Sequence, residues 1–282
     1  MKRHSDKDLW SAWRELRADQ NRCSHEIMVR NGDIAQGMEH PDKSRYSNII
    51  PFDEFRVRIS SKRYINASWV TFRELGERCR FIISQAPMHP KYYGTDTRGD
   101  FWHAVHEHNV TTICNLAKVE PGFSGCALYW PQHNGECATY GDYTVNVIAV
   151  EELALGLTRR QLSVHDINGT VRSVDHLHLE TWPNYGVADS HECLTQLARC
   201  CVKSQSPVLI HCSGGVGRSG TFLAIAATLR AIERECSRKT SHVHHMISFI
   251  SQMRIQRHPW CVESFEQFSF AARVLDGLFL PQ

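Results

Sequence analysis

The sequence predicts an α/β protein of one domain, in which a twisted mixed β-sheet is flanked by helices on both faces. Apolar runs typical of strands alternate with segments of helical apolar spacing along all 282 residues, and several strand runs are consecutive. Hydrophobic residues make up 42% of the chain, which is enough for a sizeable core. No Pro/Ser/Gly-rich spacer and no internal repeat divides the sequence.

The expected elements follow from these periodicities. The first is a helix over residues 6–30, where Leu9, Trp10, Trp13 and Leu16 recur at helical spacing between charged residues. Strands are expected at residues 64–70, 80–85, 111–116, 143–150, 171–179 and 207–210. Further helices are expected at residues 98–108, 190–204, 217–236, 243–254 and 262–278.

A glycine-rich turn at residues 211–221 joins the strand at 207–210 to the helix that follows. Its glycines let successive backbone N–H groups point inward, and the helix adds the positive end of its dipole. The turn is therefore expected to cradle an anion. The residues expected to bind it are Ser213, Gly214, Gly215, Val216 and Gly217.

Cys212 lies where such a cradle would hold its sulfur, so its thiolate should be favoured well below the pKa of a free cysteine. Arg218, six residues later, offers a planar fork that matches two oxygens of a phosphate. A nucleophilic sulfur facing a bound phosphate predicts phosphoryl transfer through a cysteinyl-phosphate. The alternative is a buried, inert cysteine beside a helix cap.

This turn resembles the signature loop His-Cys-x5-Arg-Ser/Thr-Gly of the protein tyrosine phosphatases. Residues 43–48 with 51–53 resemble the phosphotyrosine-recognition loop of that family, and other family motifs follow in the same order at residues 64–68, 85–87, 100–102, 129–131 and 182–187. The resemblance spans roughly residues 45–270. It implies the family fold, and one complete catalytic domain over residues 1–282.

The resemblance also implies a substrate and the residues that select it. Tyr46 would wall a cleft so deep that phosphotyrosine reaches Cys212 and phosphoserine does not, although ordinary packing of this ring is the alternative. Asn48 would fix the backbone of a substrate peptide. Phosphotyrosine-containing proteins are therefore the expected partners.

Supporting roles follow from the same resemblance. Glu120 would hold the Arg218 fork in plane, although its position before Pro121 also suits a solvated loop residue. His211 would pack under the loop and donate hydrogen bonds to backbone carbonyls. Ser219 would assist release of the Cys212 thiolate. Trp182 in the lid and Gln267, which matches a family glutamine, complete the expected site.

Two positions depart from the family pattern. Asn184 stands where relatives carry the lid aspartate that protonates the leaving tyrosyl oxygen, and an amide does not donate a proton in that way. Whether Asn184 is natural or introduced is left open. Glu263 stands where relatives usually carry a glutamine that positions water, so it would either act as a base or repel the phosphate. Asp189 is a reserve candidate for the acid.

The 17 histidines do not predict a metal site. The histidines at 103, 106 and 108 lie in an expected helix, and those at 242, 244 and 245 precede another helical stretch. No C-x2-C pair accompanies them. Solvated helix faces are the expected explanation. No metal and no cofactor are therefore expected.

Charge and cysteine content indicate the compartment and partners. The net charge of +2, from 32 basic and 30 acidic residues, gives no reason to expect nucleic acid or a membrane surface as a partner. Residues 1–6 are polar, and no apolar run approaches a membrane span. Eleven cysteines without disulfide spacing, together with a thiolate nucleophile, suit a reducing, cytoplasmic location. The oligomeric state stays open.

Three functions remain. The first is a protein tyrosine phosphatase with reduced turnover, favoured because Cys212, Arg218 and Ser219 are all present. The second is a pseudophosphatase, or a substrate-trapping form, that binds phosphotyrosine. The third is a related cysteine phosphatase for phosphoinositides or several phosphoresidues, against which the segment around Tyr46 argues.

Overall fold

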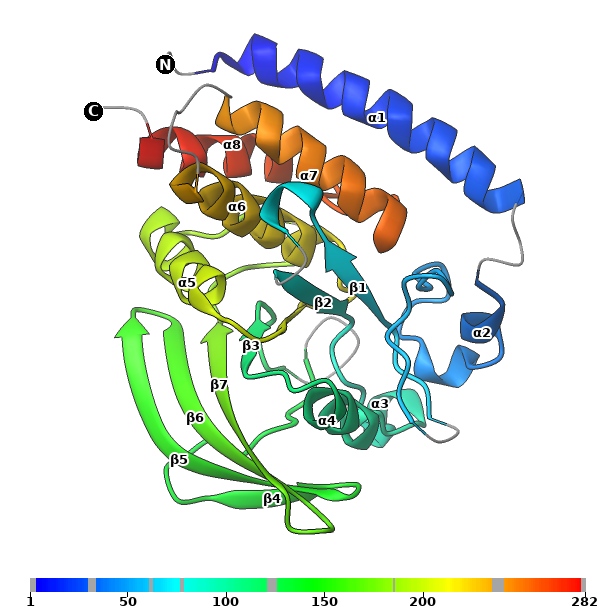
Figure 1. Ribbon diagram of the computed structural model, residues 1–282, viewed down its shortest axis with the longest axis vertical. Helices are drawn as coiled ribbons and strands as arrows, with labels where there is room; N and C mark the ends of the chain where they lie inside the picture. Colours follow the sequence, from blue (N-terminus) through cyan, green and yellow to red (C-terminus); the bar gives the residue numbers. More distant parts are fainter. Residues whose placement is uncertain are drawn as a thin grey trace.

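A computed structural model describes residues 4–29, 34–60, 63–76, 79–120, 126–184, 186–234 and 241–279. Within these ranges the centre of the fold is an eight-stranded sheet in the order β1-β2-β8-β3-β7-β6-β5-β4 (Figure 1). The strands are β1 (Ala67–Thr71), β2 (Arg80–Ser84), β3 (Thr112–Asn115), β4 (Cys137–Tyr140), β5 (Tyr143–Ala154), β6 (Leu157–Asp166), β7 (Val171–Leu179) and β8 (Val208–His211).

Helices cover both faces of this sheet, as expected. They are α1 (Asp6–Val29), α2 (Ala35–Met38), α3 (Pro90–Tyr93), α4 (Arg98–Glu107), α5 (His191–Lys203), α6 (Gly217–Arg234), α7 (His242–Gln256) and α8 (Phe265–Phe279). Short 3₁₀ turns lie at Pro41–Lys43 and Arg73–Leu75. On one face, α4 buries Phe101 and Trp102 in a core that includes Leu209 of β8. On the other, α5 and α6 form the inner layer, and α1 is the outermost helix (Figure 1).

The direction of the central strands positions the functional loop. β2, β8, β3 and β7 run parallel to one another, whereas β1 pairs antiparallel with β2, and β6 pairs antiparallel with β7. Parallel strands end at the same edge of a sheet, so the loop after β8 emerges beside the ends of β2 and β3. All four β8 residues are buried, which makes this edge a rigid base for the loop.

The expected mixed sheet with helices on both faces is confirmed, but two strands were missed. β4 has only four residues and is half exposed. β6 carries the polar run 158–161, which hides its alternation, and its pairing with β5 and β7 makes it a strand. Most expected helices agree with the structure to within three residues. The end of the helix expected at 217–236 lies outside the described residues.

The expectation that the clustered histidines lie on solvated helix faces is wrong for two of them. His242 is fully buried and hydrogen-bonded to Asp276, and His245 is also buried. His103 is partly buried, and its ring contacts the Ser60 and Tyr143 hydroxyls. The buried residues of α7 recur at helical spacing along one face, and both His242 and His245 belong to that face.

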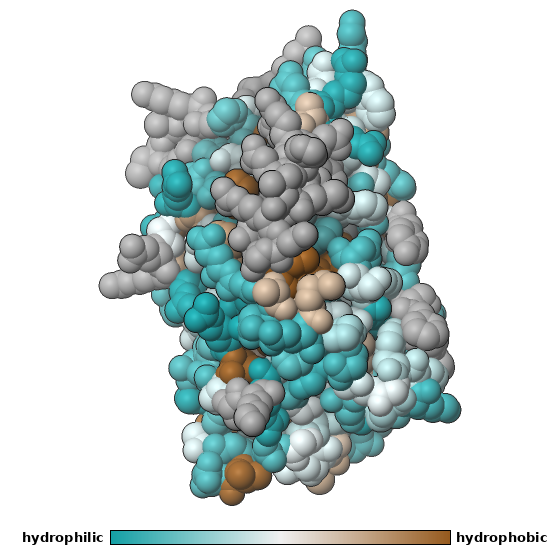
Figure 2. Space-filling view, turned by 90° about the vertical axis from the view of Figure 1, so that its right-hand side faces the viewer, coloured by the Kyte–Doolittle hydropathy of each residue, from teal (hydrophilic) through white to brown (hydrophobic). Residues whose placement is uncertain are grey.

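The surface is mostly hydrophilic on the face in Figure 2, where hydrophobic residues form small groups separated by polar ones. Among the residues that the structure describes, no helix combines the length and apolar character needed to cross a membrane.

Candidate active site

The loop between β8 and α6 depends on a glycine in a left-handed conformation. Gly215 has a φ of +70°, and a Cβ built there would lie 2.3 Å from the carbonyl oxygen of Ser84. A side chain at this position is therefore excluded both by the backbone angle and by the neighbouring strand β2. α6 begins two residues later, at Gly217, so its N-terminal N–H groups face the loop.

Cys212 lies buried at the base of this loop, and the backbone N–H of Gly215 donates a hydrogen bond to its sulfur at 3.3 Å. Burial raises the pKa of Cys212, but the Arg218 charge, the hydroxyl and N–H of Ser219 and the N–H of Gly215 together lower it below the ordinary value. The environment thus favours the thiolate.

Arg257 holds the loop from outside. Its guanidinium donates to the carbonyl oxygens of Gly214 and Gly215, each at 3.1 Å, and to the Asn66 side chain at 2.8 Å. Turning these carbonyls toward Arg257 leaves the loop N–H groups free to face an anion. Sequence reasoning missed this fully buried arginine, because only contacts across the fold distinguish it from the other basic residues.

His211 is buried beside the loop and contacts both a backbone carbonyl and a side-chain hydroxyl. Its Nδ1 approaches a single carbonyl, that of Cys212, at 3.4 Å, while its Nε2 lies 2.6 Å from the Tyr129 hydroxyl. The hydroxyl is also 2.9 Å from Nε2 of His176. Burial lowers the pKa of His211 to about 3, so the ring is neutral at pH 7. The expected contact with backbone carbonyls is therefore found for one carbonyl, and the contact with the Tyr129 hydroxyl was not expected.

Arg218 joins the loop to the lid. Its Nη1 donates to the carbonyl of Trp182 at 2.9 Å, and its Nη2 donates to the side-chain oxygen of Asn184. The Trp182 ring is buried, and its Nε1 donates to Gly186 at 3.0 Å. Glu120 lines a cavity of about 690 Å³ that also contains Arg218, Asn184 and Asp189. The pairing of Glu120 with Arg218 stays a prediction.

A second cavity, of about 300 Å³, opens above Cys212 and brings together four separate segments of the chain. Its lining consists of Tyr46, Asn48, Ile49, Asn184, Cys212, Ser213, Gly214, Val216, Gly217, Arg218, Trp260, Glu263 and Gln267. Of the expected site residues, Gly215, Ser219, His211, Trp182 and Glu120 lie outside this lining. Trp260, which is half exposed, was not among the site residues expected from the sequence. Its position three residues before Glu263 was the sequence signal that could have identified it.

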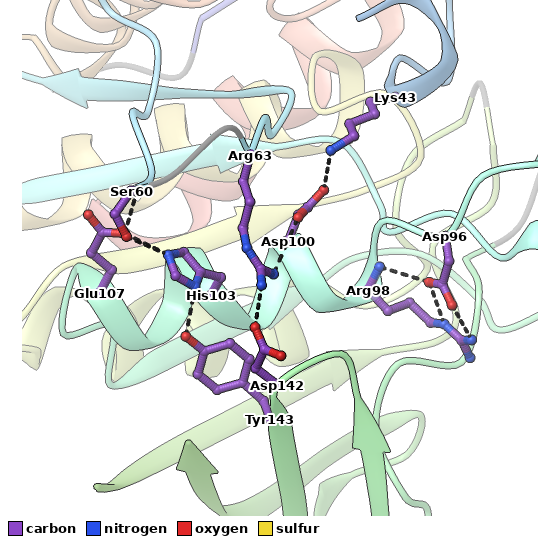
Figure 3. A network of polar contacts seen from close by, with 10 residues as sticks. All are labelled: Lys43, Ser60, Arg63, Asp96, Arg98, Asp100, His103, Glu107, Asp142 and Tyr143. Atoms are coloured by element: carbon purple, nitrogen blue, oxygen red, sulfur yellow. Dashed lines mark hydrogen bonds and ion pairs between the residues drawn. The ribbon is translucent and has the colours of Figure 1, made fainter. Parts of the chain in front are cut away.

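Tyr46 forms one wall of this cavity, and its hydroxyl lies 2.9 Å from that of Ser213. Hydrogen bonds to Gln85 hold the residues that precede Tyr46. The N–H of Arg45 donates to Gln85, whose amide donates in turn to the carbonyl of Lys43, both at 2.8 Å. Figure 3 shows Lys43 reaching Asp100 of α4, at 2.8 Å. The wall is thus anchored to the sheet and to α4.

Glu263 and Gln267 line the side of the cavity at the start of α6. An Oε atom of Glu263 is 2.9 Å, and the Gln267 amide 3.1 Å, from the place where a Cβ on Gly217 would lie. Gln267 is fixed because it accepts the N–H of Glu263 at 3.0 Å. Burial raises the pKa of Glu263, and the Arg218 charge opposes that rise only in part.

Comparisons with known proteins agree on one family. A family model described as protein-tyrosine phosphatase matches residues 40–276. Tyrosine-protein phosphatase non-receptor type 20 of Rattus norvegicus is 30% identical over 89% of this chain and 58% of its own length. Receptor-type tyrosine-protein phosphatase eta of Mus musculus is 33% identical over 84% of this chain and 19% of its own.

The fold is also similar to solved structures of a protein tyrosine phosphatase. The crystal structure of the catalytic domain of human protein tyrosine phosphatase non-receptor type 18 matches with a TM-score of 0.80 and 24% identity, over 96% of both chains. Another structure of that protein holds HER2 phosphopeptides, and matches at 0.80 with 23% identity over 96% of this chain and 99% of its own. The chain spans about half the length of the curated non-receptor relatives that it matches.

Proposed function

The chain belongs to the protein-tyrosine phosphatase family, and from that premise we propose that residues 1–282 act as one catalytic domain that hydrolyses phosphotyrosine in proteins through a cysteinyl-phosphate, with turnover reduced by Asn184. The observation that carries the proposal is the buried Cys212, whose pKa is lowered below its ordinary value and which lines, with Arg218, a cavity of about 300 Å³. A thiolate nucleophile needs a reducing compartment, which supports a cytoplasmic location.

In the first step the Cys212 thiolate attacks phosphorus while the loop N–H groups and the Arg218 fork hold the phosphate oxygens. An S–P bond forms, and the bond from phosphorus to the tyrosyl oxygen breaks. The oxygen leaves with its electron pair and needs a proton. Asn184 lies at the lid, but its amide supplies no acidic proton, so the phenolate takes one from water. The first step is therefore the slow one with tyrosine as leaving group.

In the second step water attacks the cysteinyl-phosphate, and the Cys212 thiolate is released with help from Ser219. Glu263 lines the cavity, and its raised pKa brings the carboxylate closer to the basicity of an effective general base. It accepts the proton of the attacking water, while Gln267 orients that water. Glu263, which stands where relatives usually carry glutamine, is therefore proposed to support hydrolysis of the cysteinyl-phosphate.

A second candidate function is phosphotyrosine binding without turnover. Asn184 favours it, because its amide oxygen accepts from Arg218 and thereby holds the lid at the cavity. The intact cradle with Cys212, Arg218 and Ser219 suits phosphate binding in either case. The presence of the nucleophile favours the enzyme, since a binding module does not need a thiolate.

The test compares a phosphotyrosine peptide, a phosphoserine peptide and p-nitrophenyl phosphate as substrates of the wild-type chain and of Tyr46→Ala. We expect the wild type to hydrolyse the two aryl phosphates and not phosphoserine, and to favour p-nitrophenyl phosphate strongly, because its phenolate leaves without protonation. Loss of the Tyr46 ring should lower kcat/KM for the peptide by an amount that corresponds to about 0.5–1.5 kcal/mol of lost transition-state stabilisation, the strength of one aromatic contact. The loss for p-nitrophenyl phosphate should be smaller.

Equal losses on both aryl substrates in Tyr46→Ala would indicate damage to packing instead of a lost wall. Binding of the phosphotyrosine peptide with no release of phosphate from any substrate would support the binding module and overturn the enzyme.

A further inference from the structure

Two histidines and one carboxylate meet far from the catalytic loop. Asp276 in α8 lies between His242, the first residue of α7, and His4, which precedes α1. One carboxylate oxygen of Asp276 is 2.6 Å from Nε2 of His242 and 3.2 Å from Nδ1 of His4. We refer to these three residues as the His4–His242–Asp276 cluster. In Figure 1 the beginnings of α1 and α7 and the end of α8 lie at one corner of the molecule.

The cluster offers the kinds of side chain that bind transition-metal ions. His242 is fully buried, and its Nε2 lies against the Asp276 carboxylate. A neutral imidazole and a carboxylate are the forms that bind metal ions. Asp276 is also buried, so its oxygens face the two rings more than solvent.

His4 is already oriented for such a role. Its Nδ1 faces Asp276, its Nε2 lies 3.5 Å from the Ser241 hydroxyl, and its backbone N–H donates to the other Asp276 oxygen at 3.4 Å. A ligating histidine usually donates its second ring N–H to a neighbouring oxygen, which fixes the ring. Ser241 is the neighbour that serves His4 in this way.

The geometry points to a binding site for a divalent transition metal of the zinc type, held by Nδ1 of His4, Nε2 of His242 and an oxygen of Asp276. The three ligand atoms lie within 4.8 Å of one another. Ligands of a tetrahedral zinc ion lie about 3.3 Å apart, as bond lengths near 2 Å require. The His4–Asp276 separation of 3.2 Å is close to that value. Binding through Nε2 of His242 requires the tautomer of the neutral ring that carries its proton on Nδ1, and the 2.6 Å His242–Asp276 pair widens as the ion enters.

The site is proposed to fasten the N-terminal segment without taking part in catalysis. α7 has 15 residues and is therefore about 22 Å long, with His242 at one end and Arg257, which holds the catalytic loop, just past the other. A metal at the cluster would join the start of α1 to α7 and α8. The Asp6–Arg273 ion pair, at 2.9 Å, already links α1 to α8 nearby.

Metal content and thermal unfolding test the proposal in the Cys212→Ser background, because the catalytic thiolate would also bind zinc. The full chain is stripped with a chelator, loaded with ZnCl2 or CoCl2 and dialysed. We expect about one ion per chain, a raised unfolding midpoint and the visible absorption of tetrahedral cobalt. His4→Gln and Asp276→Asn should weaken zinc binding at least about tenfold.

The matched control is His244→Gln, an exposed histidine on the same helix, which should bind zinc like its parent. His4 is only partly buried, so His4→Gln keeps the test informative if Asp276→Asn does not fold. Zinc retained equally by His4→Gln and its parent, or zinc retained by neither, would overturn the proposal and leave the cluster as a hydrogen-bonded triad.

Discussion

Replacing Cys212 by serine should lower kcat on every aryl phosphate by on the order of 10⁴–10⁶-fold while phosphopeptide binding is kept. A serine hydroxyl is far less ionised than this thiolate at neutral pH, yet it leaves the loop N–H groups and the Arg218 fork in place. Phosphate release at fixed reaction times measures the loss of kcat. Calorimetric titration with a phosphotyrosine peptide measures the retained binding.

The matched control is Cys126→Ser. The Cys126 thiol is equally buried, but burial raises its pKa to about 12, so it is protonated at neutral pH. Its sulfur donates to the carbonyl of Ala127 at 3.1 Å, a bond that a hydroxyl keeps. Cys126→Ser should therefore retain most of the activity. Wild-type rates in Cys212→Ser would contradict a covalent mechanism.

Restoring a carboxylic acid at the lid with Asn184→Asp should raise the rate on a phosphotyrosine peptide by roughly 10²–10⁴-fold, the usual size of a general-acid effect. Tyrosine has a phenolic pKa near 10 and leaves poorly without a proton, whereas p-nitrophenolate needs little help. The gain on p-nitrophenyl phosphate should therefore be much smaller, and steady-state rates on the two substrates measure the difference.

The pH profile gives an independent reading of the same substitution. The wild type should rise in activity as the Cys212 thiolate forms, at a pH below the ordinary cysteine range because the pKa of Cys212 is lowered. Asn184→Asp should add a falling limb at higher pH, since the new acid works only while protonated. Asp189→Asn is the control and should change neither property. An unchanged peptide rate and profile in Asn184→Asp would mean that another group is the acid.

The sequence was informative where function depends on local spacing. The sequence predicted a strand at 207–210, a glycine turn at 211–221 and a helix after it, and the structure has β8, a left-handed Gly215 and α6 in that order. Strand β6 was missed because its pairing with β5 and β7, not its own alternation, makes it a strand. The three strands are consecutive along the chain, but the periodicity of one segment does not show what it pairs with.

In the candidate site, motifs identified residues of the cavity, whereas contacts between distant residues were missed. Tyr46, Asn184 and Glu263 were singled out from motifs, and the structure places all three around the cavity above Cys212. The bonds of Arg257 to Gly214 and Gly215 were missed, as was the hydroxyl of Tyr129 beside His211. Each of these contacts joins residues more than 40 positions apart, so only the folded chain reveals it.

The most direct test of the proposed function is to trap the phosphorylated enzyme. The wild-type chain is mixed with excess p-nitrophenyl phosphate, quenched in acid within milliseconds and digested for mass spectrometry. The covalent mechanism predicts one phosphoryl group on the peptide that contains Cys212, formed in step with a burst of p-nitrophenolate and absent from Cys212→Ser. Steady turnover with no phosphoryl group on that peptide, or with the group on another residue, would contradict it.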